Sequence, residues 1–495
     1  MNRLGFDNDK YLKLQSQNIR DRISKFGGKL YLEFGGKLFD DFHASRVLPG
    51  FAPDSKVRML MEMKDEAEVV ICISADDIER SKRRGDLGIT YDEDTLRLID
   101  AFRGIGLYIG SVVLTRYQEQ PVAVQFKKRL ELMGIRVFKH YNIPEYPSNI
   151  PLVVSDDGFG KNEYIETERS LVVITGPGPG SGKMATCLSQ LYHEHKRGVS
   201  AGYAKFETFP VWNLPLKHPV NLAYEAATAD LDDVNMIDPF HLEAYGVTTV
   251  NYNRDVEIFP VLEAMFKRIY GESPYKSPTD MGVNMVGDCI IDDEACRDAS
   301  KQEIIRRYYS ASCSVRQGFS DPKEVQKIEL MMNSLGLSSE NRPVVAAALS
   351  RAEETGAPAV ALELADGRII TGKTSPLLGA SSACLLNALK ALAGIDKKLL
   401  LISPSIIQPI QTLKIQHLGN HNPRLHTDEL LIALSICAVT NPMAGYALDQ
   451  LGKLRGCEAH SSVILSNVDT DLFKKLGINI TFEPKYQAKK LFHKS

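Results

Sequence analysis

The sequence predicts an α/β protein built from three-layer parallel-sheet domains, a P-loop-like unit and a mixed α/β C-terminal domain. Three observations predict this class. Strand-like and helix-like runs alternate from 28 to 143, a strand, a glycine loop and a helix follow one another from 171, and mixed elements continue after 325. The 495 residues, of which 44% are hydrophobic, suffice for about three cores. We therefore expect domains at 1–165, 166–324 and 325–495.

The first region is expected to be Rossmann-like, because apolar β-rich runs alternate with amphipathic helical runs. That alternation is typical of a parallel sheet with helices on its faces. The expected strands are KLYLEF, VVICIS, LYIGSVVLTRY and RVFKHYNI, and the expected helices are DEDTLRLIDAF and VAVQFKKRLELMG.

The second and third regions also combine the hydrophobic period of helices with that of strands. After the strand LVVIT, the second region is expected to hold the helix MATCLSQLYHEHKRG, the strand SAGYAKFETFPV and the helices EIFPVLEAMFKRIYG and DEACRDASKQEIIRRYY. The third is expected to hold the helices VVAAALSRAEET and SACLLNALKAL, the hairpin ALELADGRIITG, and the strands KLLLIS, SSVILS and INITFEP.

Composition argues against several partners. A net charge of -3, from 59 basic and 62 acidic residues, gives no overall field that would attract nucleic acid or an anionic membrane. The N-terminus has no apolar signal segment, and the eight cysteines form no C-x-x-C pair. We expect a cytoplasmic protein with reduced thiols, no nucleic-acid or membrane partner, and possible homo-oligomerisation.

The glycine loop of residues 176–183, GPGPGSGK, is the strongest functional signal. A loop of this kind between a strand and a helix turns backbone N–H groups toward an anion, and the helix dipole and a lysine add positive charge. We expect it to bind the phosphates of ATP. The predicted binding residues are Gly176, Gly178, Gly180, Ser181, Gly182 and Lys183.

The loop departs from the G-x-x-x-x-G-K-[ST] pattern, because Pro177 replaces a glycine and Met184 replaces a hydroxyl residue. Residues 367–374, GRIITGKT, match that pattern in every letter. Their β-branched residues follow an Asp-Gly turn, so this segment is predicted to be a hairpin strand instead.

Lys205 and Glu207 lie two residues apart on the strand after the loop helix, so both side chains face the same way. We expect Lys183 and Lys205 to be catalytic, with Lys205 orienting an anionic substrate. Mg²⁺, which keeps water and phosphate oxygens as ligands, is expected at Glu207, Asp230, Asp232 and Asp233. The alternatives are an ordinary ion pair at Lys205 and a solvated acidic turn at 230–233.

Two further clusters remain open. His417, His421 and His426 could bind a metal, contribute with Arg424 to an anionic pocket, or lie on ordinary surface, and His460 could simply satisfy a backbone group. The charged run 76–84, DDIERSKRR, follows a predicted strand. It could bind phosphate, or it could be a solvated face.

The segments GPGPGSGK and AKFE resemble CTP synthase and, more loosely, dethiobiotin synthetase. Met184 has a counterpart in CTP synthase, and Asp230-Leu231-Asp232 resembles its Asp-Leu-Asp segment, but Thr228 stands where that family has a glutamate. Over nearly its whole length the chain also resembles an uncharacterised bacterial family, domain of unknown function 1846. That match rests on GKLYLEFGGKL, ASRVLPG, GYAKFETFPVWNLP, ADLDDVNMIDPFH, SPTDMGVNMVG and NPRLH.

These observations favour an ATP-dependent phosphoryl-transfer enzyme, a kinase or a ligase, that acts on an anionic small molecule. Two alternatives stay open. The chain could be a nucleotide- or phosphate-sensing binding protein without turnover, or an enzyme whose glycine loop holds a phosphate of its substrate.

Overall fold

The computed structural model describes residues 3–35, 38–39, 41–84 and 88–487. The chain divides into two compact units. The large unit contains Leu4–Glu225 and Asp233–Ala299, and the small unit contains Ala226–Asp232 and the chain from Ser300 onward. Both units combine helices with a β-sheet, so the predicted α/β class is confirmed.

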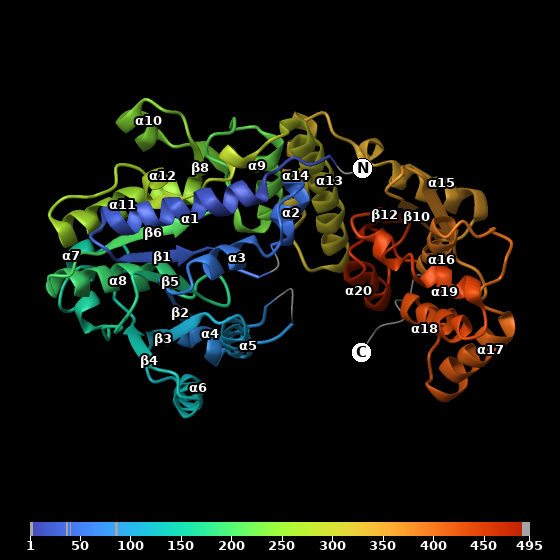
Figure 1. Cartoon of the computed structure of the whole chain (residues 1–495), viewed down its shortest axis with the longest axis horizontal. Helices are drawn as coiled ribbons and strands as arrows, with labels where there is room; N and C mark the ends of the chain where they lie inside the picture. The colour runs from blue at the N-terminus through green and yellow to red at the C-terminus, as the bar shows by residue number, and fades with distance from the viewer. Residues whose placement is uncertain (1–2, 36–37, 40, 85–87, 488–495) are drawn as a thin grey trace. The chain divides into compact units, whose positions relative to one another are not determined.

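The large unit is built around a seven-stranded sheet in which every pair of neighbours is parallel (Figure 1). Its central strands read as nearly continuous apolar runs, as expected when both faces of a sheet are covered. In the order β4-β3-β2-β5-β1-β6-β9, the strands are β4 (Val137–Tyr141), β3 (Tyr108–Tyr117), β2 (Ala67–Ser74), β5 (Leu171–Thr175), β1 (Leu30–Phe34), β6 (Gly202–Phe206) and β9 (Gly282–Val283).

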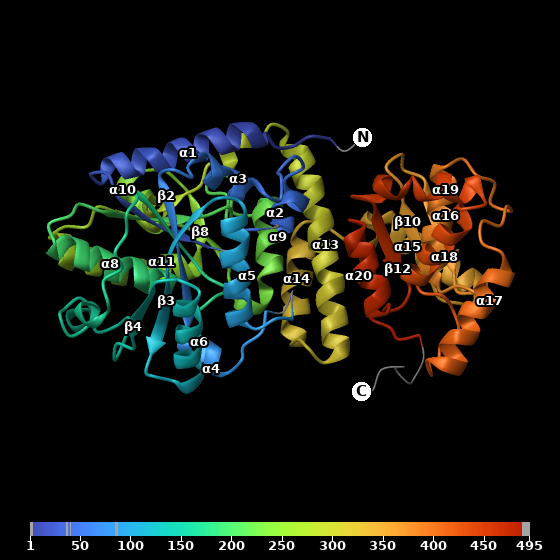
Figure 2. The same cartoon turned by 60° about the horizontal axis from the view of Figure 1, so that its bottom comes forward.

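Helices cover both faces of this sheet (Figure 2). Because successive strand residues point to opposite faces, Leu30 and Leu32 pack into one core while Tyr31 packs into the other. The first core joins the sheet to α1 (Asn8–Lys25), α3 (Ser55–Glu62), α5 (Tyr91–Gly104) and α6 (Pro121–Leu132), and the second joins it to α8 (Lys183–Lys196), α11 (Asn253–Tyr270) and α12 (Pro278–Met281).

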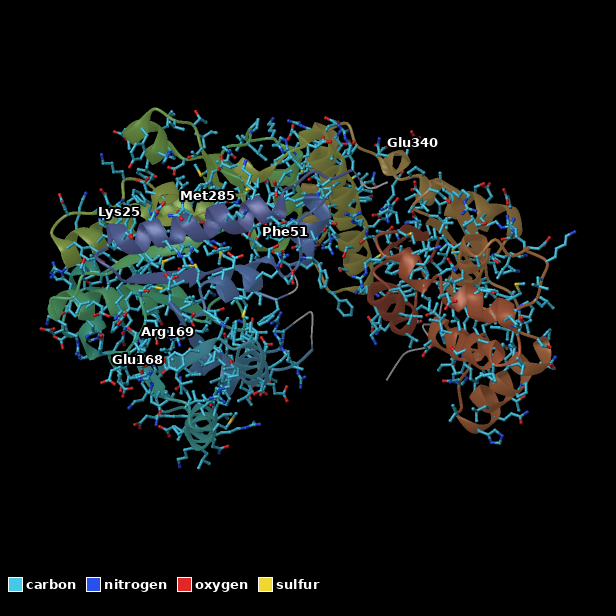
Figure 3. All side chains as sticks on the ribbon, viewed as in Figure 1. Lys25, Phe51, Glu168, Arg169, Met285 and Glu340 are labelled. Atoms are coloured by element: carbon cyan, nitrogen blue, oxygen red, sulfur yellow. The ribbon has the colours of Figure 1, made fainter. Side chains whose placement is uncertain are left out.

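Helix α1 closes the edge of the sheet through a buried amide. Gln15 donates to the carbonyl oxygen of Val283 in β9 at 3.0 Å and accepts from the backbone N–H of Met285 at 2.9 Å. Figure 3 shows Met285 beside α1, with Lys25 at the carboxyl end of that helix. The side chain thus replaces the neighbouring strand that the backbone of β9 would otherwise need.

The remaining elements of the large unit are short. A two-stranded antiparallel sheet pairs β7 with β8, and short helices connect the strands. These elements are α2 (Phe42–Val47), α4 (Ala75–Glu79), α7 (Ile150–Val153), α9 (Pro219–Ala227), β7 (Asn235–Ile237), α10 (Pro239–Tyr245) and β8 (Val250–Tyr252).

The order of the strands creates a topological switch point between β2 and β5. From β2 the chain moves outward to β3 and β4, whereas from β5 it moves the opposite way to β6. The helix after β2 and the helix after β5 consequently lie on opposite faces, in different cores. The domain boundary expected near 165 falls between β4 and β5 of this one sheet.

The small unit holds a four-stranded mixed sheet in the order β11-β10-β12-β13. The predicted hairpin is confirmed, because β10 (Ala359–Glu363) pairs antiparallel with β11 (Ile369–Lys373). The other strands are β12 (Glu458–Ser461) and β13 (Asn479–Phe482). After α13 (Asp293–Gln317), which enters this unit at Ser300, come α14 (Pro322–Ser334), α15 (Pro343–Thr355), α16 (Ala380–Leu392), α17 (Pro404–Thr412), α18 (Thr427–Ala438), α19 (Pro442–Leu448) and α20 (Asn467–Lys475).

Two expected strands of the small unit are wrong. The run KLLLIS, 398–403, is a loop whose start is tied by the Lys390 ammonium, which donates to the carbonyls of Lys397 and Leu399 at 2.6 and 2.7 Å. The strand expected at SSVILS lies earlier in the chain, as β12, so His460 is a strand residue and does not precede the strand.

Candidate functional site

The glycine loop leaves β5 at the switch point of the large unit. Residues 176–182 connect β5 to α8, as predicted, and β2 lies next to β5 in the sheet. All these strands are parallel, so their carboxyl ends share one edge. In open α/β sheets ligands bind at this edge, in the crevice where the strand order reverses. The fold therefore places the loop where a ligand is expected.

The loop packs closely against β2, β3 and α5 through its glycines. A Cβ at Gly176 would lie 2.4 Å from the Cys72 carbonyl oxygen, and a Cβ at Gly178 would lie 2.3 Å from the Tyr91 hydroxyl. Gly182 has φ of +87°, and its Cβ would meet Thr115 at 2.8 Å. Only glycine gives this backbone both the approach and the left-handed conformation that it needs.

Lys183, the first residue of α8, folds back over the loop. Its ammonium donates to the Gly178 carbonyl at 3.3 Å and to the Ser181 hydroxyl at 3.4 Å. The loop is held from the other side by Thr115, which donates to the Ser181 carbonyl at 2.9 Å. Lys183 is half-buried, whereas Pro179 and Gly180 are exposed. The cation, the helix N-terminus and an accessible loop thus converge on one place.

Met184, the residue after the loop lysine, anchors the start of α8 in the apolar core. Its side chain packs against the core that contains Cys187 and Leu188. The position that carries a metal-binding hydroxyl in a standard P-loop therefore serves packing here.

A second group of charges lies along neighbouring strands of the same sheet. The Lys205 ammonium is 2.7 Å from Glu207 Oε1 and 2.5 Å from Asp255 Oδ2 in α11. Glu33 of β1 lies opposite Lys205 in the strand register and accepts from the Tyr203 hydroxyl at 2.7 Å. Lys205 thus has two carboxylate partners within the protein. The ordinary ion pair, which was the alternative to a substrate-binding role for Lys205, is therefore present.

Burial strongly affects the pKa values of Lys205, which lies in β6, and of Glu207, which directly follows β6. Burial raises the pKa of Glu207 to about 7 even though Lys205 opposes this, and Asp255 adds to the increase. Burial lowers the pKa of Lys205, but the Asp255 and Glu207 carboxylates outweigh it and hold that pKa above its usual value. Proton-exchanging groups at functional sites commonly have such shifts, as do structural ion-pair networks.

The four predicted metal-binding carboxylates are divided between the two units. Asp230 and Asp232 belong to the small unit, where Asp232 pairs with Lys327. Asp233 belongs to the large unit, is buried and lies 3.3 Å from Arg254. Across residues 3–35, 38–39, 41–84 and 88–487, no three His, Cys, Asp or Glu side chains are grouped so that they could hold a metal ion.

His426 and His460 have hydrogen-bond partners within the small unit, whereas His417 and His421 are exposed. The His426 ring lies 3.0 Å from Asp469, and this hydrogen bond raises the pKa of His426. His460 is buried and lies 2.8 Å from the Thr481 hydroxyl. Arg424 donates to the Ser375 carbonyl at 2.9 Å. His417 and His421 belong to no metal-binding group of the described chain.

The run 76–84 after β2 lies within the described residues, which stop at Arg84 and resume at Gly88. Lys82 pairs with Asp77 at 3.3 Å and lies 4.8 Å from the centre of the Tyr91 ring. Arg84 donates to Asp94 at 2.8 Å. The Tyr91 ring, over which Lys82 lies, also packs against Gly178. The basic run therefore borders the glycine loop.

The comparisons with known proteins identify the family. Residues 4–336 match the family described as "Domain of unknown function DUF1846, N-terminal", and residues 340–492 match its C-terminal counterpart. The chain belongs to the DUF1846 family. It is 59% identical over 494 residues to a UPF0371 protein of Streptococcus thermophilus, with all of both chains covered. It is 60% identical over 492 residues to a UPF0371 protein of Corynebacterium urealyticum, with 99% of each covered.

A relative in Streptococcus pyogenes, also a UPF0371 protein, is 58% identical over 494 residues, again with all of both chains covered. These names attach no activity to the family. Within the described part of this DUF1846 protein, every helix is too short or too polar to cross a membrane.

Proposed function

We propose that this protein is an ATP-dependent phosphoryl-transfer enzyme of the kinase or ligase type. One observation carries the proposal: a glycine loop lies at the switch point of a parallel sheet, with Lys183 folded over it from the start of α8. The backbone N–H groups, the helix dipole and the ammonium would bind the phosphates. Lys205 lies in β6 and Glu207 directly follows that strand, at its carboxyl end.

Mg²⁺ is proposed to reach the site with the nucleotide, because it keeps phosphate oxygens and water as its main ligands. Glu207 is the predicted carboxylate nearest to this role, but it already pairs with Lys205. We assign no step of the reaction to a metal-binding carboxylate. An anionic substrate at Lys205 would have to replace Glu207 or Asp255 as a partner.

Calorimetric titration with Mg-ATP tests this proposal. We expect Lys183→Ala to weaken binding by about 30-fold or more, since removing one partner of a desolvated charge pair costs about 2 kcal/mol or more. Lys373→Ala is the matched control, because it removes the lysine of the other Gly-Lys pair, in β11. Equal affinities of the wild type and Lys183→Ala for Mg-ATP would contradict the proposal.

A second candidate is an enzyme whose glycine loop holds a phosphate of the substrate. The packing of Met184 into the core favours it, because no hydroxyl follows Lys183 to bind a nucleotide-bound metal. Binding of sugar phosphates that depends on Lys183, together with no binding of ATP, would select this candidate. Tight Mg-ATP binding without phosphate release would instead indicate a nucleotide sensor.

A further inference from the structure

Ser74, the last residue of β2, has a buried hydroxyl without a partner. Its exposed fraction is 2%, and Ser74 Oγ forms no hydrogen bond within the part of the chain that the structure describes. A buried hydroxyl that lacks a hydrogen bond destabilises a folded protein, so such groups are rare. The Ser74 hydroxyl therefore calls for a polar partner, which a bound molecule would supply.

The position of Ser74 at the start of a helix makes the unpartnered hydroxyl more unusual. Ser74 directly precedes α4, and a serine at this position usually accepts a hydrogen bond from a backbone N–H of the first turn. Its side chain makes no such bond to α4. The hydroxyl is thus not used to cap the helix that follows it.

The strand period shows which way the Ser74 side chain points. Ile73 packs into the core that contains α5, whereas Cys72 packs into the core that contains α8. Cys72 Sγ lies 3.4 Å from the hydroxyl of Thr186 in α8. Because successive side chains of a strand alternate, Ser74 is on the α8 side, like Cys72 but nearer to the carboxyl end. It is directed toward the start of α8 and the glycine loop.

The glycine loop touches the sheet on both sides of Ser74. At the start of the loop, a Cβ at Gly176 would lie 2.4 Å from the Cys72 carbonyl oxygen. Thr115 of β3 is the partner of Ser74 in the strand register, and it donates to the Ser181 carbonyl at 2.9 Å. The loop therefore passes over the end of β2, where the Ser74 hydroxyl lies.

The loop itself has no hydroxyl after its lysine, since Met184 packs into the core. We propose that Ser74 supplies a hydroxyl from the neighbouring strand and donates a hydrogen bond to a phosphate group held by the glycine loop. A phosphate oxygen is a strong acceptor, so it satisfies the buried donor. The phosphate belongs either to a nucleotide or to a phosphorylated metabolite. This proposal rests on the proposed binding of phosphate by the loop.

The same loop contacts explain how a phosphate reaches a buried hydroxyl. Lys183 and Ser181 both donate to the Gly178 carbonyl, at 3.3 and 3.0 Å. A charged phosphate oxygen accepts these two hydrogen bonds more strongly than a carbonyl does. When the phosphate takes both donors, the Gly178 carbonyl is released and the loop is free to turn away from the end of β2.

Calorimetric titration of the full chain tests the proposal, with Mg-ATP and glucose 6-phosphate as probes. Ser74→Ala is expected to weaken binding of the probe that the wild type binds by about 10-fold or more, because a hydrogen bond to a charged group is lost. Ser74→Cys, which keeps the size but has only a weak donor, is expected to lose affinity as well.

Urea denaturation without a ligand separates this role from a structural one. Ser74→Ala is expected to be at least as stable as the wild type, because the substitution removes no hydrogen bond of the folded protein. A loss of stability without a loss of affinity would overturn the proposal.

Ser111→Ala is the matched control. Ser111 of β3 is also buried with an unpartnered hydroxyl in the described structure, but it lies four residues before Thr115, toward the opposite edge of the sheet. Its affinity for either probe should equal that of the wild type. An equal loss of affinity in Ser111→Ala and Ser74→Ala would overturn the proposal.

The two probes distinguish this proposal from the proposed function. Binding of Mg-ATP that is lost in Lys183→Ala but unchanged in Ser74→Ala would overturn the role of Ser74 and leave the proposed function standing. Binding of glucose 6-phosphate, and not of Mg-ATP, that depends on both residues would support the role of Ser74 and contradict the ATP-dependent reaction. No binding of either probe would overturn both.

Discussion

Two segments of this chain end in the same Gly-Lys pair, and the structure gives them different backbones. Gly182-Lys183 closes a loop between β5 and α8, with Gly182 at φ of +87°. Gly372-Lys373 lies inside β11, hydrogen-bonded in register to β10. The second segment matches the P-loop letters and the first does not. The proposed phosphate binding thus rests on the strand-loop-helix context and not on the spacing of letters.

The glycine of each pair is required for a different reason. Gly182 provides a left-handed turn next to Thr115, whereas Gly372 lets the backbone of α16 approach the strand. Substitution of Gly372 should therefore lower stability without changing ligand affinity, whereas substitution of Gly182 should lower both.

The largest expected loss of stability is that of Gly372→Ala. Its Cβ would lie 2.1 Å from the backbone nitrogen of Cys384, so α16 would have to move away from β11. We expect the free energy of unfolding to fall by about 3 kcal/mol, the upper end of the overpacking range. Urea denaturation measures this change. Unchanged affinity for phosphate ligands is expected as well, and a loss of affinity would break the proposed distinction.

Gly182→Ala should have a smaller effect on stability and a large one on binding. A left-handed alanine costs about 1–2 kcal/mol, and Thr115 must also shift. We expect a loss of about 2 kcal/mol in urea denaturation and a clear loss of Mg-ATP or phosphate affinity by calorimetry.

Gly367→Ala is the control for backbone strain alone. Gly367 has φ of +83°, but no heavy atom lies within 4 Å of its Cβ position. We expect about 1 kcal/mol of destabilisation and no change in ligand affinity. If Gly182→Ala behaved like Gly367→Ala in both measurements, the first segment would be an ordinary turn.

A pH dependence of stability is expected as well, and it belongs to the large unit. Glu207 has its pKa raised to about 7 from a usual 4.5, so the folded protein binds this proton more tightly than the unfolded chain. The stabilisation is complete below about pH 4.5 and is lost as the pH rises through about 7. The slope cannot exceed about 1.4 kcal/mol per pH unit for one group.

Chemical denaturation between these pH values measures the slope for the wild type and Glu207→Gln. The variant cannot ionise, so its free energy of unfolding should vary less over this window. Parallel curves would show that Lys205 and Asp255 compensate fully for the burial of Glu207.

Much of the fold could be predicted, because most elements have clear hydrophobic periods. The four strands expected before residue 143 are β1 to β4, and the helix expected after the glycine loop is α8. Helix α1 was not predicted, since its buried face includes the polar residues Gln15 and Ser16, which interrupt the apolar stripe. Gln15 is buried because it serves the edge of β9, a role that no local pattern reveals.

The candidate site could be predicted only where it is local in sequence. The glycine loop and the Lys205–Glu207 pair follow from motif and strand period. Asp255 and Tyr91 do not, because their proximity depends on the order of strands and the placement of α11 and α5. An Asp in the first turn of an amphipathic helix after β8 is a weak signal that could have drawn attention to Asp255.

The position of β1 has a consequence for how the protein is made. It is synthesised before the other six strands of its sheet, but it lies between β5 and β6, where Leu30 pairs with Leu171 and Gly202. Both of its partners are synthesised much later, so β1 must wait unpaired while β2, β3 and β4 can already assemble in order. The centre of the sheet is therefore completed last, and such long-range parallel pairing is intrinsically slow. A nascent chain that stops before residue 171 would expose an apolar strand with no neighbour, which is a typical substrate for chaperones.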